Sequence, residues 1–325
     1  MGRASKTTGR TVAHLLQSSN ASITKMHKIS QLLFANKKKL YLIIDDTLIK
    51  KIYATNMRGA CLFYDTKLRQ RIMAYKVVTG MLSDGDLAIP IGFDYLYSKE
   101  IVDACTDKLL TKDEIVEALV SKVIELFPNT KIIITADGLY ASVNFLKWCT
   151  ENKYDVEVRM HANRKVTYKG VAKSLKQLAT EEGIKITGRK TARTISVAWH
   201  GLLLEVTIVK RVDKKGAESI VFQAATYKAE PRVHVKTYKI RWKTEKAYRT
   251  SKQSIGIGDC FSQQLTVQRN HTAASLLAYA IAQLEMKRLG FDTPEQAIRA
   301  LREMFIHTDF NESIESFKSS AWYHA

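Results

Sequence analysis

Two apolar runs that lead directly into aspartates constrain the fold of this chain more than any other feature. Residues 40–44 read Leu-Tyr-Leu-Ile-Ile and are followed by Asp45, and residues 131–136 read Lys-Ile-Ile-Ile-Thr-Ala and are followed by Asp137. Continuous apolar runs of this length are typical of strands buried on both faces, as in parallel sheets. We therefore predict an α/β fold in which two parallel neighbouring strands end in carboxylates.

The segments between and after these runs carry both strand and helix signals. Residues 59–93 alternate in polarity and are punctuated by glycines and a proline, which predicts two or three strands. Thr111 and Glu114 have the spacing of a capping box, and the apolar periodicity that follows predicts a helix ending near Pro128. We expect a second helix to run through Trp148.

The second half of the chain begins with a basic stretch rich in strand signals. A short strand is predicted at residues 156–160, and residues 162–225 then show further strand runs, at 195–199, 202–209 and 219–224. We interpret the stretch as an insertion that interrupts the α/β core. From residue 235 the pattern becomes helical through Lys252, and a second, apolar helix is predicted at 270–288.

Charge limits the partners of the chain. Its 325 residues include 51 Lys and Arg against 32 Asp and Glu, a net charge of +19. Apolar stretches such as 40–44 are far shorter than the roughly 18 residues that a membrane span needs, so a spanning role is excluded. A soluble protein this basic usually meets a polyanion, and DNA or RNA is the leading class. The cysteines have no zinc-finger spacing, so we predict buried thiols in a reducing compartment; they are Cys61, Cys105, Cys149 and Cys260.

The chain up to Ile44 contains eight Lys and Arg residues and no Asp or Glu. A mitochondrial transit peptide has this composition, and so does an arm that contacts DNA. We favour the arm, because the excess of positive charge continues through the rest of the chain.

A third carboxylate, Glu245, lies in a strongly basic helical segment. Residues 228–252 contain nine Lys and Arg residues against two glutamates. In a continuous helix Tyr238, Arg241, Glu245 and Lys252 would fall within an arc of roughly 60°. A lone glutamate among lysines usually forms ion pairs on a helix surface. A carboxylate trio in a cationic setting also suits two-metal phosphoryl transfer on a phosphodiester, and we adopt that interpretation.

The spacing Tyr238-x2-Arg241-x3-Glu245-x6-Lys252 resembles the Tyr-Arg-Glu-Lys signature of the DDE transposases of bacterial insertion sequences, in the insertion-sequence-4 branch. Three further segments are similar to that family in the same order. They are Ile44-Asp45-Asp46-Thr47, Thr135-Ala-Asp137-Gly-Leu-Tyr140 and the segment from His271 to Tyr279. The resemblance extends over roughly residues 38–290.

The resemblance implies an RNase H-like catalytic core interrupted by a β-rich insertion. The implied limits are a basic N-terminal arm at 1–37, the two parts of the core at 38–161 and 228–290, the insertion at 162–227 and a helical tail at 291–325. The implied reaction is metal-dependent cleavage and strand transfer at transposon ends, with excision through a DNA hairpin. The implied enzyme acts on double-stranded DNA as a homodimer in the bacterial cytoplasm, associated with the nucleoid.

The resemblance also implies roles for single residues. Asp45, Asp137 and Glu245 are the expected catalytic residues and the ligands of two Mg²⁺ or Mn²⁺ ions, with Asp46 as the alternative to Asp45. Expected DNA contacts come from Tyr238, Arg241, Lys252, Arg249 and Arg164. Arg159 and Asn163 fit either a DNA contact or a solvated loop. For Trp242 a core position is favoured over stacking on a base, and for His271 a structural role is favoured.

Two other functions remain open at this point. One is an inactive DNA-binding remnant of a transposase. The carboxylate trio argues against it, but family members commonly carry a longer region for end recognition than the 44 residues that precede Asp45 here, which keeps this alternative open. The other is a simple metal-dependent nuclease, which would not need Tyr238, Arg241 and Lys252.

Overall fold

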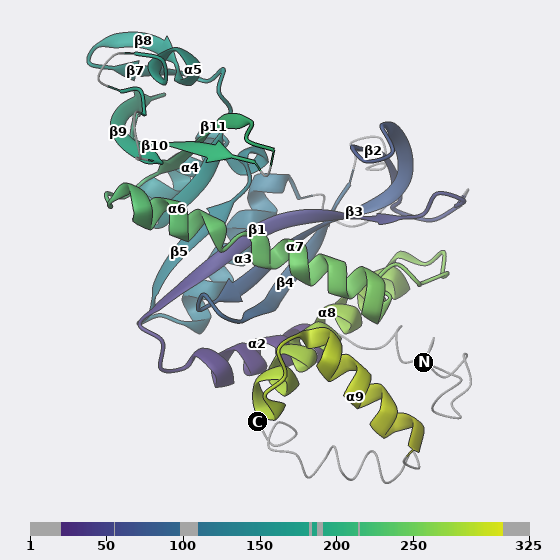
Figure 1. Ribbon diagram of the computed structural model, residues 1–325. Helices are drawn as coiled ribbons and strands as arrows, with labels where there is room; N and C mark the ends of the chain where they lie inside the picture. Colours follow the sequence, from purple (N-terminus) through teal and green to yellow (C-terminus); the bar gives the residue numbers. More distant parts are fainter. Residues whose placement is uncertain are drawn as a thin grey trace. The chain divides into compact units, whose positions relative to one another are not determined.

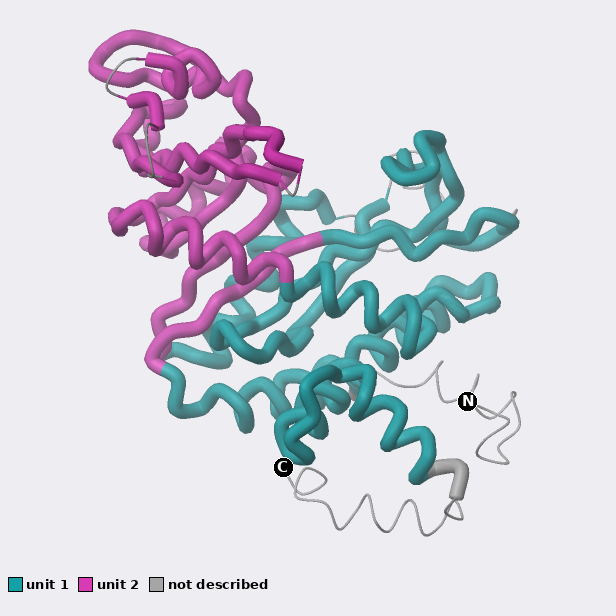
Figure 2. Tube along the Cα trace, in the orientation of Figure 1, with its two compact units in different colours: residues 1–37, 46–128, 243–325 teal, residues 38–45, 129–242 magenta. Residues whose placement is uncertain are grey.

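The computed structural model describes residues 21–54, 56–97, 110–181, 184–186, 191–213 and 215–307 (Figure 1). They form two compact units (Figure 2). Unit 1 is built from the described residues within 1–37, 46–128 and 243–325, and unit 2 from those within 38–45 and 129–242. Strands and helices occur in both units, so the predicted α/β class is confirmed. In the described ranges no helix has the length and apolar character needed to cross a membrane.

Unit 2 is organised around a mixed sheet. Its strand order is β1-β5-β6-β11-β10-β9-β7-β8. The pairs β1–β5 and β5–β6 are parallel, and the later pairs are antiparallel. The strands are β1 (Lys39–Lys50), β5 (Lys131–Ala136), β6 (Asp155–Met160), β7 (Lys165–Tyr168), β8 (Val171–Ser174), β9 (Ala192–Trp199), β10 (Leu202–Val212) and β11 (Glu218–Ala225).

The strands predicted in the second half of the chain are confirmed as β6, β9, β10 and β11. β9 and β10 form a hairpin across His200 and Gly201, whose φ angles are +49° and +84°. Two consecutive positive φ values are typical of the type I′ turn, which matches the twist of the flanking strands. The helical elements of unit 2 are η2 (Gly138–Tyr140), α4 (Val143–Glu151), α5 (Leu175–Leu178) and α6 (Pro231–Lys239).

Unit 1 combines a small antiparallel sheet with most of the longer helices. β3 pairs with β2 on one side and with β4 on the other, and α2, α3 and α8 pack against β4. The elements are α2 (Ala21–Phe34), β2 (Cys61–Asp65), β3 (Gln70–Ser83), β4 (Ala88–Leu96), α3 (Lys112–Leu126), α7 (Trp242–Thr250), the π-helical turn η3 (Ser251–Ile255), α8 (Leu265–Leu289) and α9 (Pro294–His307).

Local signals in unit 1 place its elements well. The three strands β2–β4 occupy the region where two or three were expected. Both halves of the capping box are present: Glu114 N donates to Thr111 Oγ1 at 3.2 Å, and Thr111 N donates to Glu114 Oε2 at 2.7 Å. The helix that it starts ends just before Pro128, as predicted. The apolar helix predicted from residue 270 begins five residues earlier, at Leu265.

The first buried strand was predicted to end at Asp45, and this is wrong. β1 continues to Lys50, and Thr47 and Ile49 are buried in its second half. The chain passes from unit 2 to unit 1 between Asp45 and Asp46 without leaving the extended conformation. In the sequence, the two consecutive aspartates look like the end of a strand. In the structure, however, neighbouring strands pair with both halves of β1, and this pairing keeps the chain extended.

Some predictions lie partly outside the described residues. Residues 1–20 of the predicted N-terminal arm, Cys105, and residues 308–325 of the predicted tail are not described. Within the described part, Cys61, Cys149 and Cys260 are buried, as expected.

Candidate functional site: two strand-borne aspartates and a basic helix

The two strand-borne aspartates are neighbours in unit 2. β1 and β5 pair in parallel with Ile44 opposite Ala136. The next residues, Asp45 within β1 and Asp137 just after the end of β5, therefore lie next to one another. Both residues are partly buried, and Asp137 also begins the short η2 turn. The prediction that the two strands are parallel neighbours is confirmed.

Two side chains from the end of α6 reach these carboxylates. Arg241 Nη1 donates to Asp45 Oδ2 at 3.1 Å, and the two side chains are only 12% and 14% exposed. The hydroxyl of Tyr238 points at Asp137 Oδ1 from 3.5 Å, which is at the long limit of a hydrogen bond. Burial raises the pKa of Tyr238 to about 12, so its hydroxyl keeps its proton at neutral pH. Unit 2 thus brings together four of the predicted site residues.

Asp46 takes part in a different contact. Its carboxylate pairs with Lys76 Nζ of β3 at 3.1 Å, within unit 1. Successive side chains of a strand point to opposite faces, so Asp45 and Asp46 cannot face the same partner. Arg241 contacts Asp45, which makes Asp45 the aspartate that shares its surroundings with Asp137.

The single helix predicted through Lys252 is wrong. α6 ends at Lys239, the turn at Ile240 and Arg241 follows, and α7 begins at Trp242. The turn is closed by short-range bonds from Ile240 N to Thr237 O and from Arg241 N to Tyr238 O. Lys252 itself lies in the π-helical turn η3. The calculation that placed four residues on one helical face therefore does not apply, because an interrupted helix does not keep a constant rotation per residue.

Trp242 is also not a core residue, because 48% of its surface is exposed. Its ring lies 5.8 Å from the guanidinium carbon of Arg241, which lies at the same distance from the ring of Tyr238. Arg241 therefore contacts a carboxylate and two aromatic rings, which restricts the orientation of its planar head group.

Glu245, Arg249 and Lys252 belong to unit 1. Glu245 and Arg249 are exposed one turn apart on α7. Lys252 Nζ donates to Thr47 Oγ1 at 2.6 Å, and its burial lowers the pKa of the ammonium group. Thr47 was not predicted as a site residue, although it is the last residue of the segment Ile44-Asp45-Asp46-Thr47 named above.

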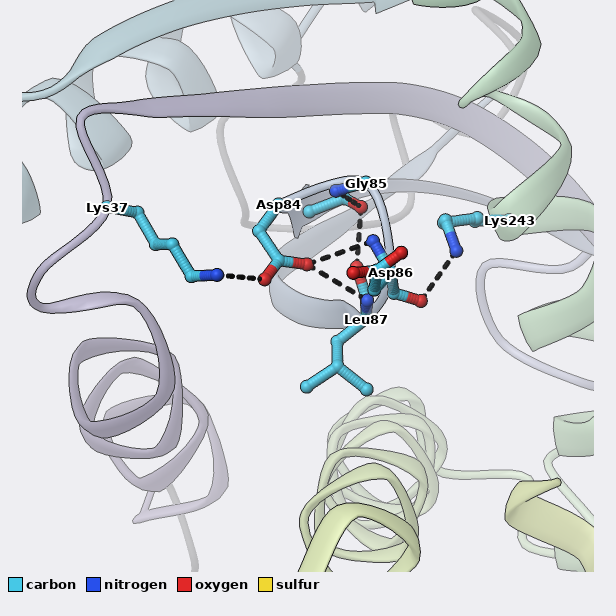
Figure 3. A network of polar contacts seen from close by, with 7 residues as sticks. Lys37, Asp84, Gly85, Asp86, Leu87 and Lys243 are labelled. Carbon is cyan, nitrogen blue, oxygen red and sulfur yellow. Dashed lines mark hydrogen bonds and ion pairs between the residues drawn. The ribbon is translucent and has the colours of Figure 1, made fainter. Parts of the chain in front are cut away.

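Polar contacts within unit 1 hold the helix that carries Glu245. Lys243, at its start, donates to the carbonyl of Asp86 at 2.5 Å, and Tyr248 shares a 2.6 Å hydrogen bond with buried Thr79 of β3. Figure 3 shows the β3–β4 loop that Lys243 contacts. In that loop Asp84 accepts bonds from the backbone N–H groups of Asp86 and Leu87, both at 3.0 Å. Asp84 also pairs with Lys37 at 2.8 Å.

The carboxylate of Asp84 is expected to make stability depend on pH. Burial alone would raise its pKa, but Lys37 and the two amide donors outweigh this effect and lower it. A lowered folded pKa stabilises the fold above the unfolded value of about 3.9 and loses that contribution as the pH falls through the folded value. We predict that Asp84→Asn lowers the unfolding free energy by about 1 kcal/mol at pH 7.

Urea unfolding at pH 7, 5 and 3 measures this effect, and the difference between wild type and Asp84→Asn should shrink below about pH 4. The matched control is Asp86→Asn, because its exposed side chain lies in the same loop. A difference of equal size at pH 3 and pH 7 would show that the ionised carboxylate is not responsible.

The turn after Lys252 depends on a glycine. Gly256 closes η3 with a φ of +88°, and its carbonyl receives a bond from His271 Nε2 of α8 at 2.9 Å. This contact agrees with the structural role expected for His271. A side chain at Gly256 would place its Cβ 2.5 Å from the Asp259 carboxylate, in a backbone region that favours glycine.

We predict that Gly256→Ala destabilises the protein by more than about 1 kcal/mol, because the left-handed backbone strains alanine and Asp259 must move. Gly258→Ala is the control, since no atom lies within 4 Å of its Cβ position and its φ is not positive. Thermal unfolding of both variants measures the difference. Equal melting temperatures would contradict the prediction.

Arg164 lines a cavity of about 640 Å³ within unit 2. Its guanidinium carbon is 5.4 Å from the ring centre of the buried Trp199. The lining residues are His161, Asn163, Arg164, Lys165, Trp199 and His200. Asn163 and Arg164 were named from the sequence, whereas Trp199 was not, because it ends a predicted strand and belongs to no motif. His161, Lys165 and His200 likewise belong to no motif.

The donor chemistry of the two aspartates fits a divalent cation. Mg²⁺ and Mn²⁺ prefer hard oxygen ligands, and Mg²⁺ is commonly held by one or two carboxylates together with waters and substrate phosphates. Asp45 and Asp137 supply two such carboxylates on neighbouring strands of the sheet. Among the described residues no group of three or more His, Cys, Asp or Glu side chains is arranged to hold a metal. A metal-binding trio that includes Glu245 therefore stays a prediction.

Comparison with protein families gives one match. Residues 112–281 match the family described as the transposase DDE domain, which is more than half of the chain. The match includes Asp137, Tyr238, Arg241 and Glu245, and Asp45 precedes it. The comparison with curated proteins found no match. Membership implies an RNase H-like fold and a DNA substrate. By this match the chain belongs to the transposase DDE domain family, and it is a transposase.

Proposed function

We propose that the chain cleaves DNA at the ends of an insertion sequence and transfers the freed strand, as a member of the insertion-sequence-4 branch. The observation that carries the proposal is the pair Asp45 and Asp137, placed next to one another by the pairing of β1 with β5 and contacted by Arg241 and Tyr238. These contacting residues occupy the first two positions of the Tyr-Arg-Glu-Lys signature. A nuclease that only hydrolyses DNA would not need this arrangement.

Asp45 and Asp137, with Glu245 as the third carboxylate, are the proposed ligands of two Mg²⁺ or Mn²⁺ ions. When bound, the ions supply Lewis-acid activation of a phosphodiester and lower the pKa of an attacking water or 3′-hydroxyl. The partial burial of Asp45 and Arg241 supports this assignment, because limited access of water strengthens the electrostatic interactions of charged groups.

The proposed DNA contacts are positively charged or aromatic groups near these carboxylates and on α7. Arg241 has the planar donor geometry that suits a phosphate, and Tyr238 is a protonated donor. Arg249 is exposed on α7, so its side chain can contact the phosphates of DNA that approaches from the solvent. Lys252 and Arg164 complete the proposed set. The net charge of the whole chain, +19, favours binding to a polyanion.

The proposed organisation is an RNase H-like core at 38–161 and 228–290, with a basic arm at 1–37, a β-rich insertion at 162–227 and a tail at 291–325. β9, β10 and β11 follow β6 in the chain and precede α6, which supports an insertion between two core segments. Excision through a hairpin and action as a homodimer complete the proposal, since joining two transposon ends requires two catalytic centres.

The assignment of Asp45 can be tested against its neighbour. We predict that Asp45→Asn lowers the rate of end cleavage at least about 100-fold, which corresponds to about 2.7 kcal/mol of transition-state stabilisation. Asp46→Asn should cleave within about 3-fold of wild type, because Asp46 pairs with Lys76 instead. Asp137→Asn and Glu245→Gln should behave like Asp45→Asn.

The measurement is single-turnover cleavage of a labelled duplex made from the inverted repeat beside the gene, with Mg²⁺ or Mn²⁺, resolved on a denaturing gel. Hairpin and strand-transfer products in wild type only would support the full proposal. Cleavage without joined products would support a nuclease instead. Binding without cleavage by wild type would reject the enzymatic proposal for this chain.

A further inference from the structure

The face of the unit 2 sheet that lies beneath α6 carries several buried polar side chains. Thr135 of β5 pairs with Glu157 of β6, and Gln223 of β11 pairs with Thr207 of β10. All four side chains are at most 2% exposed. The pairing of Glu157 with Ala225 puts Gln223, two residues earlier, on the same face as Glu157. The helix above this face cannot be held mainly by aliphatic packing.

The same face leads to the two aspartates. Ile43 of β1 pairs with Thr135 of β5. Asp45 and Asp137 come two residues after these positions, so the alternation of side chains puts them on the face that α6 covers. The contacts of Arg241 with Asp45 and of Tyr238 with Asp137 agree with this placement.

α6 offers few apolar side chains to this face. Its buried residues are His234, Thr237 and Tyr238, and Val233 is 37% exposed. The helix contacts β5, β6, β9, β10 and β11 (Figure 1). Burial of a few polar side chains supplies little hydrophobic stabilisation, so directional hydrogen bonds must fix the helix on the sheet.

A buried contact between His234 and Glu157 supplies such a bond. His234 Nδ1 lies 3.2 Å from Glu157 Oε2, with side chains 1% and 0% exposed. The hydroxyl of Tyr227, which precedes the helix, donates to the same oxygen at 2.7 Å. Within the described part of the chain, His234 Nε2 and Glu157 Oε1 have no hydrogen-bond partner. Within these residues, the contact of Nδ1 with Glu157 is therefore the polar link between the His234 ring and the sheet.

This link sits one turn before the residues that contact the aspartates. His234 and Tyr238 are four residues apart, which places them on the same helical face about 6 Å apart along the axis. Arg241 follows in the turn that ends the helix. A rotation or slide of α6 about its contact with Glu157 would move both side chains relative to Asp45 and Asp137.

We propose that His234 and Glu157 are positioning residues, which lock the register of α6 on the sheet and thereby hold Tyr238 and Arg241 against the two aspartates. The inference rests on the proposed function for its effect on catalysis. Its structural part, the anchoring of α6, can be measured without DNA. Burial raises the pKa of Glu157, while the bonds from His234 and Tyr227 oppose this effect.

The first test is hydrogen exchange on the full-length protein. We predict that His234→Leu speeds amide exchange in residues 231–241 at least about 10-fold, because the helix loses its link to the sheet. His234→Asn should restore protection, since its side-chain amide can replace the Nδ1 donor. Thr226→Val is the matched control: the hydroxyl of Thr226 bonds Val156 N at 3.0 Å and Tyr154 O at 3.2 Å, outside the helix.

The second test is single-turnover cleavage of the repeat duplex. His234→Leu should lower the cleavage rate about 10- to 100-fold, because small displacements of positioned groups are costly, while its affinity for the duplex changes less than about 3-fold. His234→Asn should recover most of the rate. Thr226→Val should keep the wild-type rate at a temperature where all the variants are folded.

The outcomes separate the two proposals. Unchanged exchange in residues 231–241 of His234→Leu, or faster exchange spread evenly over the whole chain, would overturn the anchoring. Selective loss of protection in that helix with a wild-type cleavage rate would overturn the positioning role. If wild type itself does not cleave, the proposed function fails, and the exchange experiment still decides whether His234 anchors α6.

Discussion

The in-register parallel pairing of β1 with β5 is the constraint on which the candidate site depends. Six consecutive residue pairs, from Lys39 opposite Lys131 to Ile44 opposite Ala136, fix the relative position of the two strands. A slip of one residue would turn one of the two aspartates to the opposite face of the sheet. The apolar side chains that make the strands recognisable therefore also determine where the carboxylates lie, and a mutation within either strand would act on the site through the register.

The same pairing creates an electrostatic problem that α6 addresses. Two neighbouring carboxylates, one within β1 and one just after β5, both partly withdrawn from water, repel one another and lose hydration. The guanidinium of Arg241 compensates one of these charges, and the hydroxyl of Tyr238 faces the other. Beneath the helix, Glu157 has its own compensation from His234 and Tyr227. This side of the sheet is therefore held largely by polar contacts, whereas the core elsewhere is largely aliphatic.

Elements with a local signal could be predicted from the sequence. The apolar runs gave β1 and β5, the spacing of Thr111 and Glu114 gave the start of α3, and the strand runs gave β9, β10 and β11. The parallel arrangement of the aspartate strands followed from the same runs. The site was predictable as far as its residues occur in a spaced motif, which covers Asp45, Asp137, Tyr238 and Arg241.

Features that depend on distant parts of the chain could not be predicted. The continuation of β1 beyond Asp45 depends on pairing with neighbouring strands, and the break after Lys239 interrupts a segment whose periodicity looks continuous. The contact between Glu157 and His234 joins residues 77 positions apart. Neither Glu157 nor His234 belongs to a sequence motif that would identify this contact, because a single histidine in a basic helix produces no periodic pattern.

The division of the chain after Asp45 and after Trp242 has a consequence for biosynthesis. Unit 1 draws on segments from both sides of residues 129–242, so it cannot be completed until the ribosome has made all of unit 2. Unit 2 in turn needs residues 38–45, which are synthesised long before their partners in β5. Such distant pairings raise the contact order and slow folding. Nascent chains that stop before residue 243 would have α2 and α3 but would lack α8, so part of β4 would be exposed, and quality control would meet them in that state.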